Sequence, residues 1–300
     1  MNGRSLSISV LIRALRVYQW PKNLFVFAAL VFAEQLGDQL QVFKSVVAFL
    51  VFCAASSATY VFNDMVDIEN DRAHPEKCKR PLPSGELSIR SAIAMMVVLA
   101  SAAVVVAWSL GPGFLAIVLF YMTLTALYTV ALRNVVIIDV LVVAAGFVIR
   151  AMAGAIALHV AFSNWLVVCT LFLALFLGLS KRRHEVGLLE HKSAVSHRKV
   201  LQFYSLAYLD HLIVIVTAAT VITYTIYTCS PEVVGRIGTD KLYLTLPFVI
   251  YGLFRYFHLV HFDDAGGDPT QTLFKDWPLV LTIVLYGLAC VGIIYGAKLV

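Results

Sequence analysis

Three aspartates and an asparagine form the part of the sequence with the clearest chemistry. Asn63, Asp64, Asp67 and Asp71 lie in the string NDMVDIENDR, directly after an apolar segment long enough to cross a bilayer. On a continuing helix the three aspartates share one face, where their charges repel unless a cation lies between them. Carboxylates suit Mg²⁺, which proteins bind through a few such groups together with substrate phosphates. We predict these four residues as Mg²⁺ ligands and the three aspartates as catalytic residues, since a merely solvated helix end would not place acids at the last turn of a span.

A basic segment with several prolines follows the acids. Its bases are Arg72, Lys77, Lys79 and Arg80. They could anchor the chain at the inner membrane face, but anchoring needs no prolines, and three of them stiffen this segment. An arginine such as Arg80 can hold a phosphate through two parallel hydrogen bonds. We predict that Arg72, Lys77 and Arg80 bind an anionic substrate.

A second charged segment, SKRRHEVGLLEHK, spans residues 180–192. Helical spacing places Lys181, Arg182 and Glu185 on one face and turns Arg183 away from it. Three bases after a membrane span also satisfy the positive-inside rule without any further role. Basic side chains that face the acidic motif would complement its negative charge, so we predict a functional role for this face of the helix.

Several polar residues lie within or beside apolar segments, where ionisable groups are costly and usually functional. Arg150 either pairs with Asp139 or reaches a substrate phosphate, and the sequence favours neither. Arg133 opens the same segment after Tyr128, and we predict that both contact substrate. Lys22, in the string YQWPKN, is either an interfacial anchor or a further phosphate ligand.

Composition indicates the elements that position these residues. The 300-residue chain is 60% hydrophobic and 14% charged, with a mean hydropathy of +0.85, which is typical of a polytopic membrane protein. Continuous apolar runs predict an all-α bundle with nine spans, centred near residues 30, 52, 100, 122, 147, 171, 218, 250 and 288. Residues 5–18 lack a cleavage signature and predict an interfacial helix.

The basic residues predict the orientation of this bundle. With the N-terminus inside, the lysines and arginines that fall in outer segments are Lys44, Arg236, Lys241 and Lys298. All others except two that lie within spans are on the inner side, so the N-terminus and the acidic motif are expected to face the cytoplasm, as in a bacterial plasma membrane. The two charged inner segments follow the second and sixth spans, which suggests one membrane domain, 1–300, with similar halves at 20–135 and 136–300.

The chain resembles the UbiA superfamily of intramembrane prenyltransferases over nearly its whole length. NDMVDIENDR matches the first aspartate motif of that family, and YTVALRNVVIIDVLVVAAGFVIRAMAG matches its middle helix pattern. The resemblance implies a nine-helix bundle with a cytoplasm-facing polar cavity. It also implies that Asn63, Asp64, Asp67 and Asp71 bind Mg²⁺ and a diphosphate.

One departure from the family pattern narrows the expected chemistry. Aromatic prenyltransferases of the family carry a second aspartate-rich motif after the sixth helix, whereas here the segment is basic with Glu185. With YQWPKN and RAHPEKCKRPLPSG, this is similar to the branch that transfers phosphoribosyl from phosphoribosyl diphosphate to a polyprenyl (decaprenyl-type) phosphate. The resemblance implies that Lys181 and Glu185 act in catalysis and that a larger set lines the polar cavity: Lys22, Lys77, Arg80, Lys181 and Glu185.

Two alternatives remain open at this stage. An aromatic prenyltransferase would need a second metal site, which only Glu185, Glu190 or the Asp263–Asp264 pair could supply. A lipid transporter or lipid-binding protein could use the same charges for gating, although broken helices in matched halves would then be expected. The net charge of +5 comes from inner segments and indicates membrane lipid rather than nucleic acid as a partner, and the sequence leaves the oligomeric state, a homo-oligomer included, undetermined.

Overall fold

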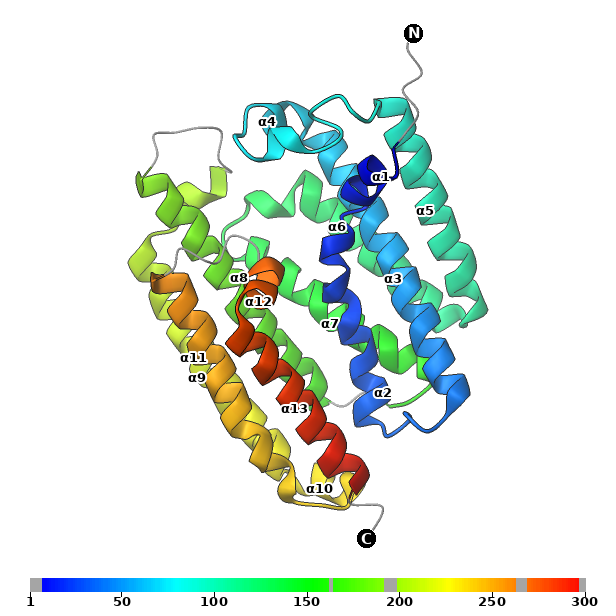
Figure 1. Cartoon of the computed structure of the whole chain (residues 1–300), viewed down its shortest axis with the longest axis vertical. Helices are drawn as coiled ribbons and strands as arrows, with labels where there is room; N and C mark the ends of the chain where they lie inside the picture. Colours follow the sequence, from blue (N-terminus) through cyan, green and yellow to red (C-terminus); the bar gives the residue numbers. More distant parts are fainter. Residues whose placement is uncertain (1–6, 162–163, 192–198, 263–268, 297–300) are drawn as a thin grey trace.

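The computed structural model describes residues 7–161, 164–191, 199–262 and 269–296, and these are helical throughout, apart from short connections (Figure 1). The elements of the first part are α1 (Ile8–Ala14), η1 (Val17–Phe27), α2 (Ala28–Phe32), α3 (Gln39–Val66), α4 (Ile68–Arg72), η2 (Lys77–Lys79), α5 (Ile89–Ser109), α6 (Pro112–Val130) and η3 (Leu132–Asn134). Those of the second part are α7 (Ile138–Leu158), α8 (Asn164–His191), η4 (Lys199–Phe203), α9 (Leu206–Cys229), α10 (Pro231–Ile237), η5 (Lys241–Thr245), α11 (Leu246–Phe262), α12 (Pro269–Lys275) and α13 (Trp277–Gly296). The η elements are 3₁₀ helices.

Eight helices within the described residues are long and apolar enough to cross a membrane, which confirms eight of the nine predicted spans. They are α3, α5, α6, α7, α8, α9, α11 with its preceding 3₁₀ turn, and α13. The chain is thus an integral membrane protein. The predicted first span, near residue 30, is not one long α-helix: it is made of η1 followed by α2, with Pro21 inside the 3₁₀ part. Proline lacks the N–H that an α-helix interior requires, which accounts for the interruption.

This first segment packs very closely against α7. A Cβ atom added to Gly154 would lie 2.0 Å from the carbonyl oxygen of Val26, so only glycine allows this approach. Farther along, Ala29 and Leu30 of α2 form a small buried cluster with Ala155 and Leu158 of α7. The position of η1, and with it the string YQWPKN, is therefore fixed by the small residues of α7.

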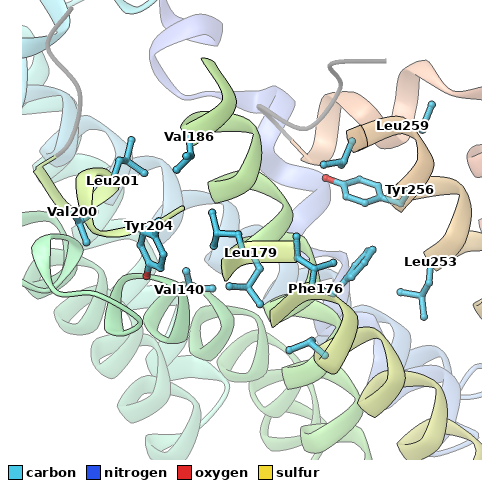
Figure 2. Close-up of a cluster of buried hydrophobic side chains, with 14 of the residues drawn as sticks. Val140, Phe176, Leu179, Val186, Val200, Leu201, Tyr204, Leu253, Tyr256 and Leu259 are labelled. Carbon is cyan, nitrogen blue, oxygen red and sulfur yellow. The ribbon is translucent and has the colours of Figure 1, made fainter. Parts of the chain in front are cut away.

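Hydrophobic side chains form two main clusters, and α7 contributes to both. One packs η1, α3, α5, α6 and α7 together, with Phe52 and Phe114 fully buried. The other joins α7 to α8, α9, α11 and α13 (Figure 2). In Figure 2, Phe176 and Leu179 of α8 lie between Tyr204 and Val140 on one side and Tyr256 on the other. The long apolar faces that these clusters leave exposed fit a lipid environment.

Polar side chains fix where several helices begin. The Asp38 carboxylate accepts hydrogen bonds from the first amides of α3, Ser88 caps α5, and Ser205 caps α9. α1 and α4 lie at one end of the bundle and α10 at the other (Figure 1). The acidic motif at the end of α3 is therefore at the α1 end.

Candidate functional site

The predicted acidic motif gathers arginines from distant parts of the chain. We call this set the aspartate group; its members are Arg16, Asp64, Asp67, Asp71, Arg80 and Arg133. The aspartate side chains are at most 12% exposed, so their charges are largely shielded from water. Each carboxylate contacts at least one guanidinium, which makes the group electrically balanced.

Asp64 and Asp71 share one arginine. Nη1 of Arg80 lies 3.1 Å from Oδ1 of Asp64 and 2.6 Å from Oδ2 of Asp71. The same Oδ1 of Asp64 also accepts a hydrogen bond from Nη2 of Arg16. The two aspartates are therefore on one side of the motif, as their spacing predicts, and Arg80 of the basic segment binds between them.

Asp67 is turned toward a different element. The helix is interrupted at this residue, which ends α3 and precedes α4, so the expected continuous helical face is not formed. Arg133 of η3 donates to both carboxylate oxygens of Asp67 at 2.5 and 2.6 Å, and these hydrogen bonds raise the pKa of Arg133 above its ordinary value. Paired contacts of this kind are among the stronger interactions of an arginine.

The other predicted residues of this region lie around the group. The Asn63 side-chain oxygen accepts a hydrogen bond of 3.4 Å from Thr129 of α6. Arg72 is exposed and pairs with Glu69 at 2.8 Å rather than with the aspartates. Lys22 in η1 and Lys77 in η2 are both half-buried. Contact of these three bases with substrate stays a prediction.

A second set of charges lies where α8 passes α7. We call it the arginine group; its members are Tyr128, Asp139, Arg182, Glu185 and Tyr204. Nε of Arg182 lies 2.7 Å from Oδ2 of Asp139, an ion pair whose angle is too bent for a hydrogen bond. Nη1 of Arg182 also donates to Glu185, and Nη2 donates to the Tyr128 hydroxyl at 3.1 Å. As the helical spacing predicts, Nζ of Lys181 lies 3.9 Å from Oε1 of Glu185. Arg183 points away from this face and pairs with Asp210.

Tyr204 completes this group from the segment after α8. Its hydroxyl donates to Oδ1 of Asp139 at 2.7 Å and accepts from the backbone amide of Ile137 at 2.7 Å. Burial raises the pKa of this hydroxyl, so it stays protonated and keeps donating. Asp139 is completely buried, and Arg182 is 4% exposed. The arginine group is thus a fixed network inside the protein.

The end of α6 joins the two groups. Thr129 contacts Asn63 of the acidic motif, its neighbour Tyr128 contacts Arg182, and Arg133 just beyond contacts Asp67. The two groups are therefore linked through the last turn of α6 and the residues just beyond it.

Arg150 lies apart from both groups. Its guanidinium donates to Asn23 at 2.7 Å, to the carbonyl oxygen of Gly146 at 2.6 Å and to the Tyr121 hydroxyl at 2.7 Å. The suggested pairing with Asp139 is wrong, because Asp139 pairs with Arg182. Arg150 fastens η1 to α6 and α7, and its contact with a substrate phosphate stays a prediction.

Three members of the groups were not selected from the sequence as site residues. Asp139 is distinguished in the sequence only by its place in an apolar segment. Arg16 is one of many bases predicted on the inner side, and nothing in the sequence around Tyr204 points to a site. A helical period cannot show which distant elements meet, so neither Arg16 nor Tyr204 could have been found by spacing alone.

The aspartate group fits Mg²⁺ by donor type, since it offers carboxylate oxygens beside an asparagine oxygen. Within the described residues, however, no three acidic, histidine or cysteine side chains already converge on one point, because arginines occupy the places between the carboxylates. A divalent cation would have to replace a guanidinium at Asp64 or Asp71. Asp263 and Asp264, suggested as ligands of a second metal, lie outside the described residues, as does the side chain of Glu190.

Known proteins place the chain in a family. A model of the UbiA prenyltransferase family matches residues 23–181. The decaprenyl-phosphate phosphoribosyltransferase of Mycolicibacterium smegmatis is 32% identical over 97% of this chain and 92% of its own length. The protein of the same name from Mycobacterium tuberculosis is 31% identical over 95% and 94%.

Solved structures agree on the fold. A UbiA homologue from Archaeoglobus fulgidus bound to GPP and Mg²⁺ is 19% identical, with a TM-score of 0.71 over 94% of this chain and 99% of that chain. A structure of digeranylgeranylglyceryl phosphate synthase is 18% identical, with a TM-score of 0.63 over 98% and 99%. These likenesses confirm the predicted all-helical UbiA architecture, and with the sequence matches they lead to one conclusion: this chain belongs to the UbiA prenyltransferase family.

Proposed function

We propose that this chain transfers the 5-phosphoribosyl group of phosphoribosyl diphosphate to a polyprenyl phosphate of the decaprenyl type and releases diphosphate. The relatives named above, similar over nearly their whole length, support this assignment. The observation that carries it is the arginine group. Both carboxylates of this group, Asp139 and Glu185, pair with Arg182, and Lys181 lies near Glu185, so neither acid is held ready for a second metal and two bases lie where the aromatic prenyltransferases carry their second aspartate-rich motif.

The aspartate group would bind the donor's diphosphate. Asn63, Asp64, Asp67 and Asp71 would hold Mg²⁺, which when bound neutralises charge on the leaving diphosphate. Arg80 and Arg133, released from the carboxylates, would contact the phosphate oxygens. Fixed cations stabilise the reaction most where negative charge builds as the bond breaks.

The remaining residues would bind the rest of the donor and the lipid. Arg182 contacts Tyr128 and Lys181 lies near Glu185, so these two bases could hold the 5-phosphate, with Glu185 keeping Arg182 oriented. In the reaction the bond from C1 of the ribose to diphosphate breaks, and a phosphate oxygen of the lipid forms the new bond to C1. That oxygen is already anionic, so no general base is needed and no proton is moved.

We infer that the protein lies in the membrane with its N-terminus in the cytoplasm, as the distribution of its lysines and arginines predicts. α1, α4 and both charged groups would face the cytoplasm of a bacterium, where phosphoribosyl diphosphate is made. The isoprenoid tail would lie along the apolar helices, in contact with membrane lipid.

The test is a transfer assay with the purified full-length protein in lipid nanodiscs. Ribose-labelled phosphoribosyl diphosphate, a polyprenyl phosphate and Mg²⁺ are expected to give a labelled lipid, and a chelator is expected to stop its formation. A parallel reaction offers a prenyl diphosphate and an aromatic acceptor. Prenylation of the acceptor without any labelled lipid would favour the second candidate, an aromatic prenyltransferase, which the fold shared with a GPP-bound homologue suggests.

A further inference from the structure

Arg16 is the one member of the aspartate group that precedes the acidic motif in the sequence, 48 residues before the Asp64 that it contacts. It lies between α1 and η1, outside the residues 23–181 that match the family model. Its side chain is 12% exposed and contacts Asp64, whose own side chain is 6% exposed. A long arginine on a terminal segment would ordinarily be exposed, so this burial requires an explanation.

The backbone at Arg16 is held in an uncommon conformation. Its φ and ψ are 50° and 49°, in the left-handed region, which residues other than glycine rarely adopt. Such a conformation persists only where the surroundings impose it, and it concentrates at functional sites. Here it lies at the junction of α1 and η1, and the side chain contacts Asp64 in the last turn of α3.

Two hydrogen bonds fasten this turn to the helix that carries Asp64. The Ser57 hydroxyl of α3 donates to the carbonyl oxygen of Leu15 at 2.8 Å. The Trp20 indole N–H donates to the Ser57 hydroxyl at 3.1 Å. The guanidinium of Arg16 also lies over the Tyr60 ring, 4.9 Å from its centre, and this cation–π interaction stabilises the positive charge. Arg16 is therefore positioned in advance and does not depend on Asp64 alone.

Charge balance indicates what this cation does. Arg16 and Arg80 both contact the same oxygen of Asp64, and a carboxylate that coordinates a divalent cation has less need of either. The guanidiniums would then be repelled by the metal, and the nearest anion for them is the bound diphosphate. Since the backbone of Arg16 is fixed, its side chain stays at the site when it leaves Asp64.

We propose that Arg16 is a diphosphate-binding residue that occupies Asp64 as a counter-ion until a divalent cation takes its place. This rests on the proposed function only in that the donor carries a diphosphate. Arg16 accordingly competes with the free cation for Asp64 and assists the diphosphate that arrives with it. Its removal has opposite effects on these two ligands.

The experiment measures both ligands on the purified full-length protein. Binding of Mn²⁺ alone is followed by its electron paramagnetic resonance signal, and binding of inorganic diphosphate is followed by calorimetry at a fixed, saturating Mg²⁺ concentration. For Arg16→Met, Mn²⁺ is expected to bind several-fold more tightly, and diphosphate is expected to bind about tenfold more weakly, the usual effect of losing one charge-assisted hydrogen bond.

Two further variants keep the result interpretable. Arg16→Lys retains the charge and much of the length, and it is expected to shift both affinities in the same directions by smaller factors, even if the methionine variant does not fold. Arg13→Met removes an arginine of the same segment, exposed and paired with Glu86, and it is expected to bind both ligands as the unmodified chain does.

The proposal is overturned if both affinities fall together in the Arg16 variants, which would indicate structural damage, or if either affinity is unchanged. Neither measurement uses a ribose or a lipid. A chain that fails to phosphoribosylate a polyprenyl phosphate can therefore still show the expected pattern, and the two proposals fail separately.

Discussion

The aspartate group and the arginine group lie at the same end of the bundle but are built in opposite ways. In the aspartate group, carboxylates of one short stretch are neutralised by arginines of three separate segments, and Arg80 is 26% exposed. In the arginine group, one arginine that is 4% exposed is enclosed by two carboxylates and a tyrosine. In the first group water can reach Arg80, whereas in the second it can reach Glu185, which is 25% exposed, but not the ion pair between Asp139 and Arg182.

This difference in burial decides which ion pairs can exchange partners and which cannot. A guanidinium near the surface can leave a carboxylate when another cation arrives, because water and the incoming ligand solvate both partners. A buried ion pair cannot be opened without leaving an uncompensated charge in a medium of low dielectric constant. We therefore expect the aspartate group to change its contacts during turnover and the arginine group to keep the same ones.

The largest effect is expected from Asp139→Ala. This change leaves the buried Arg182 with Glu185 as its remaining carboxylate partner, beside the uncharged Tyr128 hydroxyl, and it removes the acceptor of the Tyr204 hydroxyl. Loss of one partner of a buried ion pair costs about 3–5 kcal/mol of folding stability. Thermal unfolding of the purified protein in detergent measures the loss. If this variant is as stable as the unmodified chain, the arginine group is not a fixed network and the comparison fails.

Asp67→Ala is expected to act more on turnover than on folding. Asp67 and Arg133 are 12% and 13% exposed, against 0% and 4% for Asp139 and Arg182, so opening the pair leaves a less deeply buried charge and costs less folding stability. Removal of one preorganised electrostatic contact at a reaction centre lowers turnover by about 100- to 1,000-fold. The transfer assay measures this loss, and thermal unfolding serves as the control. Nearly full activity would show that Asp67 is not a ligand of the diphosphate-bound metal.

The two groups also differ in how far the sequence predicts them. The acidic motif was recognisable because its spacing is local and its position beside a span is unusual. Lys181, Arg182 and Glu185 were placed on one face correctly for the same reason. Eight spans follow from composition alone, whereas the internal structure of the first segment does not, because Pro21 and the close contact at Gly154 favour a 3₁₀ helix docked on α7.

The partners of these residues could not be predicted. Arg16, Arg133 and Tyr204 reach their carboxylates from elements far away in the sequence. Burial decides between alternative partners, and burial depends on how helices pack against one another. That is why Asp139 could not be assigned to Arg182 rather than to Arg150 from their positions along the chain.

Tyr204→Phe tests the arginine group more gently than Asp139→Ala. The change removes one hydroxyl, which now donates to Asp139 and accepts from the amide of Ile137. Leaving a buried acceptor and a backbone amide with a missing partner costs about 1–3 kcal/mol. Thermal unfolding should show an intermediate loss, with turnover reduced only in proportion to the folded fraction. A selective loss of turnover would instead place Tyr204 in contact with substrate.

The smallest effect is expected from Glu69→Ala, which removes an ion pair of the same chemical type at the surface. Glu69 and Arg72 are 79% and 51% exposed, although they lie within the acidic motif itself. Pairs this exposed contribute about 0–1 kcal/mol, because water and salt screen them and both side chains lose freedom on pairing. Unfolding midpoint and turnover should both stay close to those of the unmodified chain. A large loss of turnover would mean that Glu69 or Arg72 meets the substrate, and charge exchange would then extend beyond the buried aspartates to the outer face of α4.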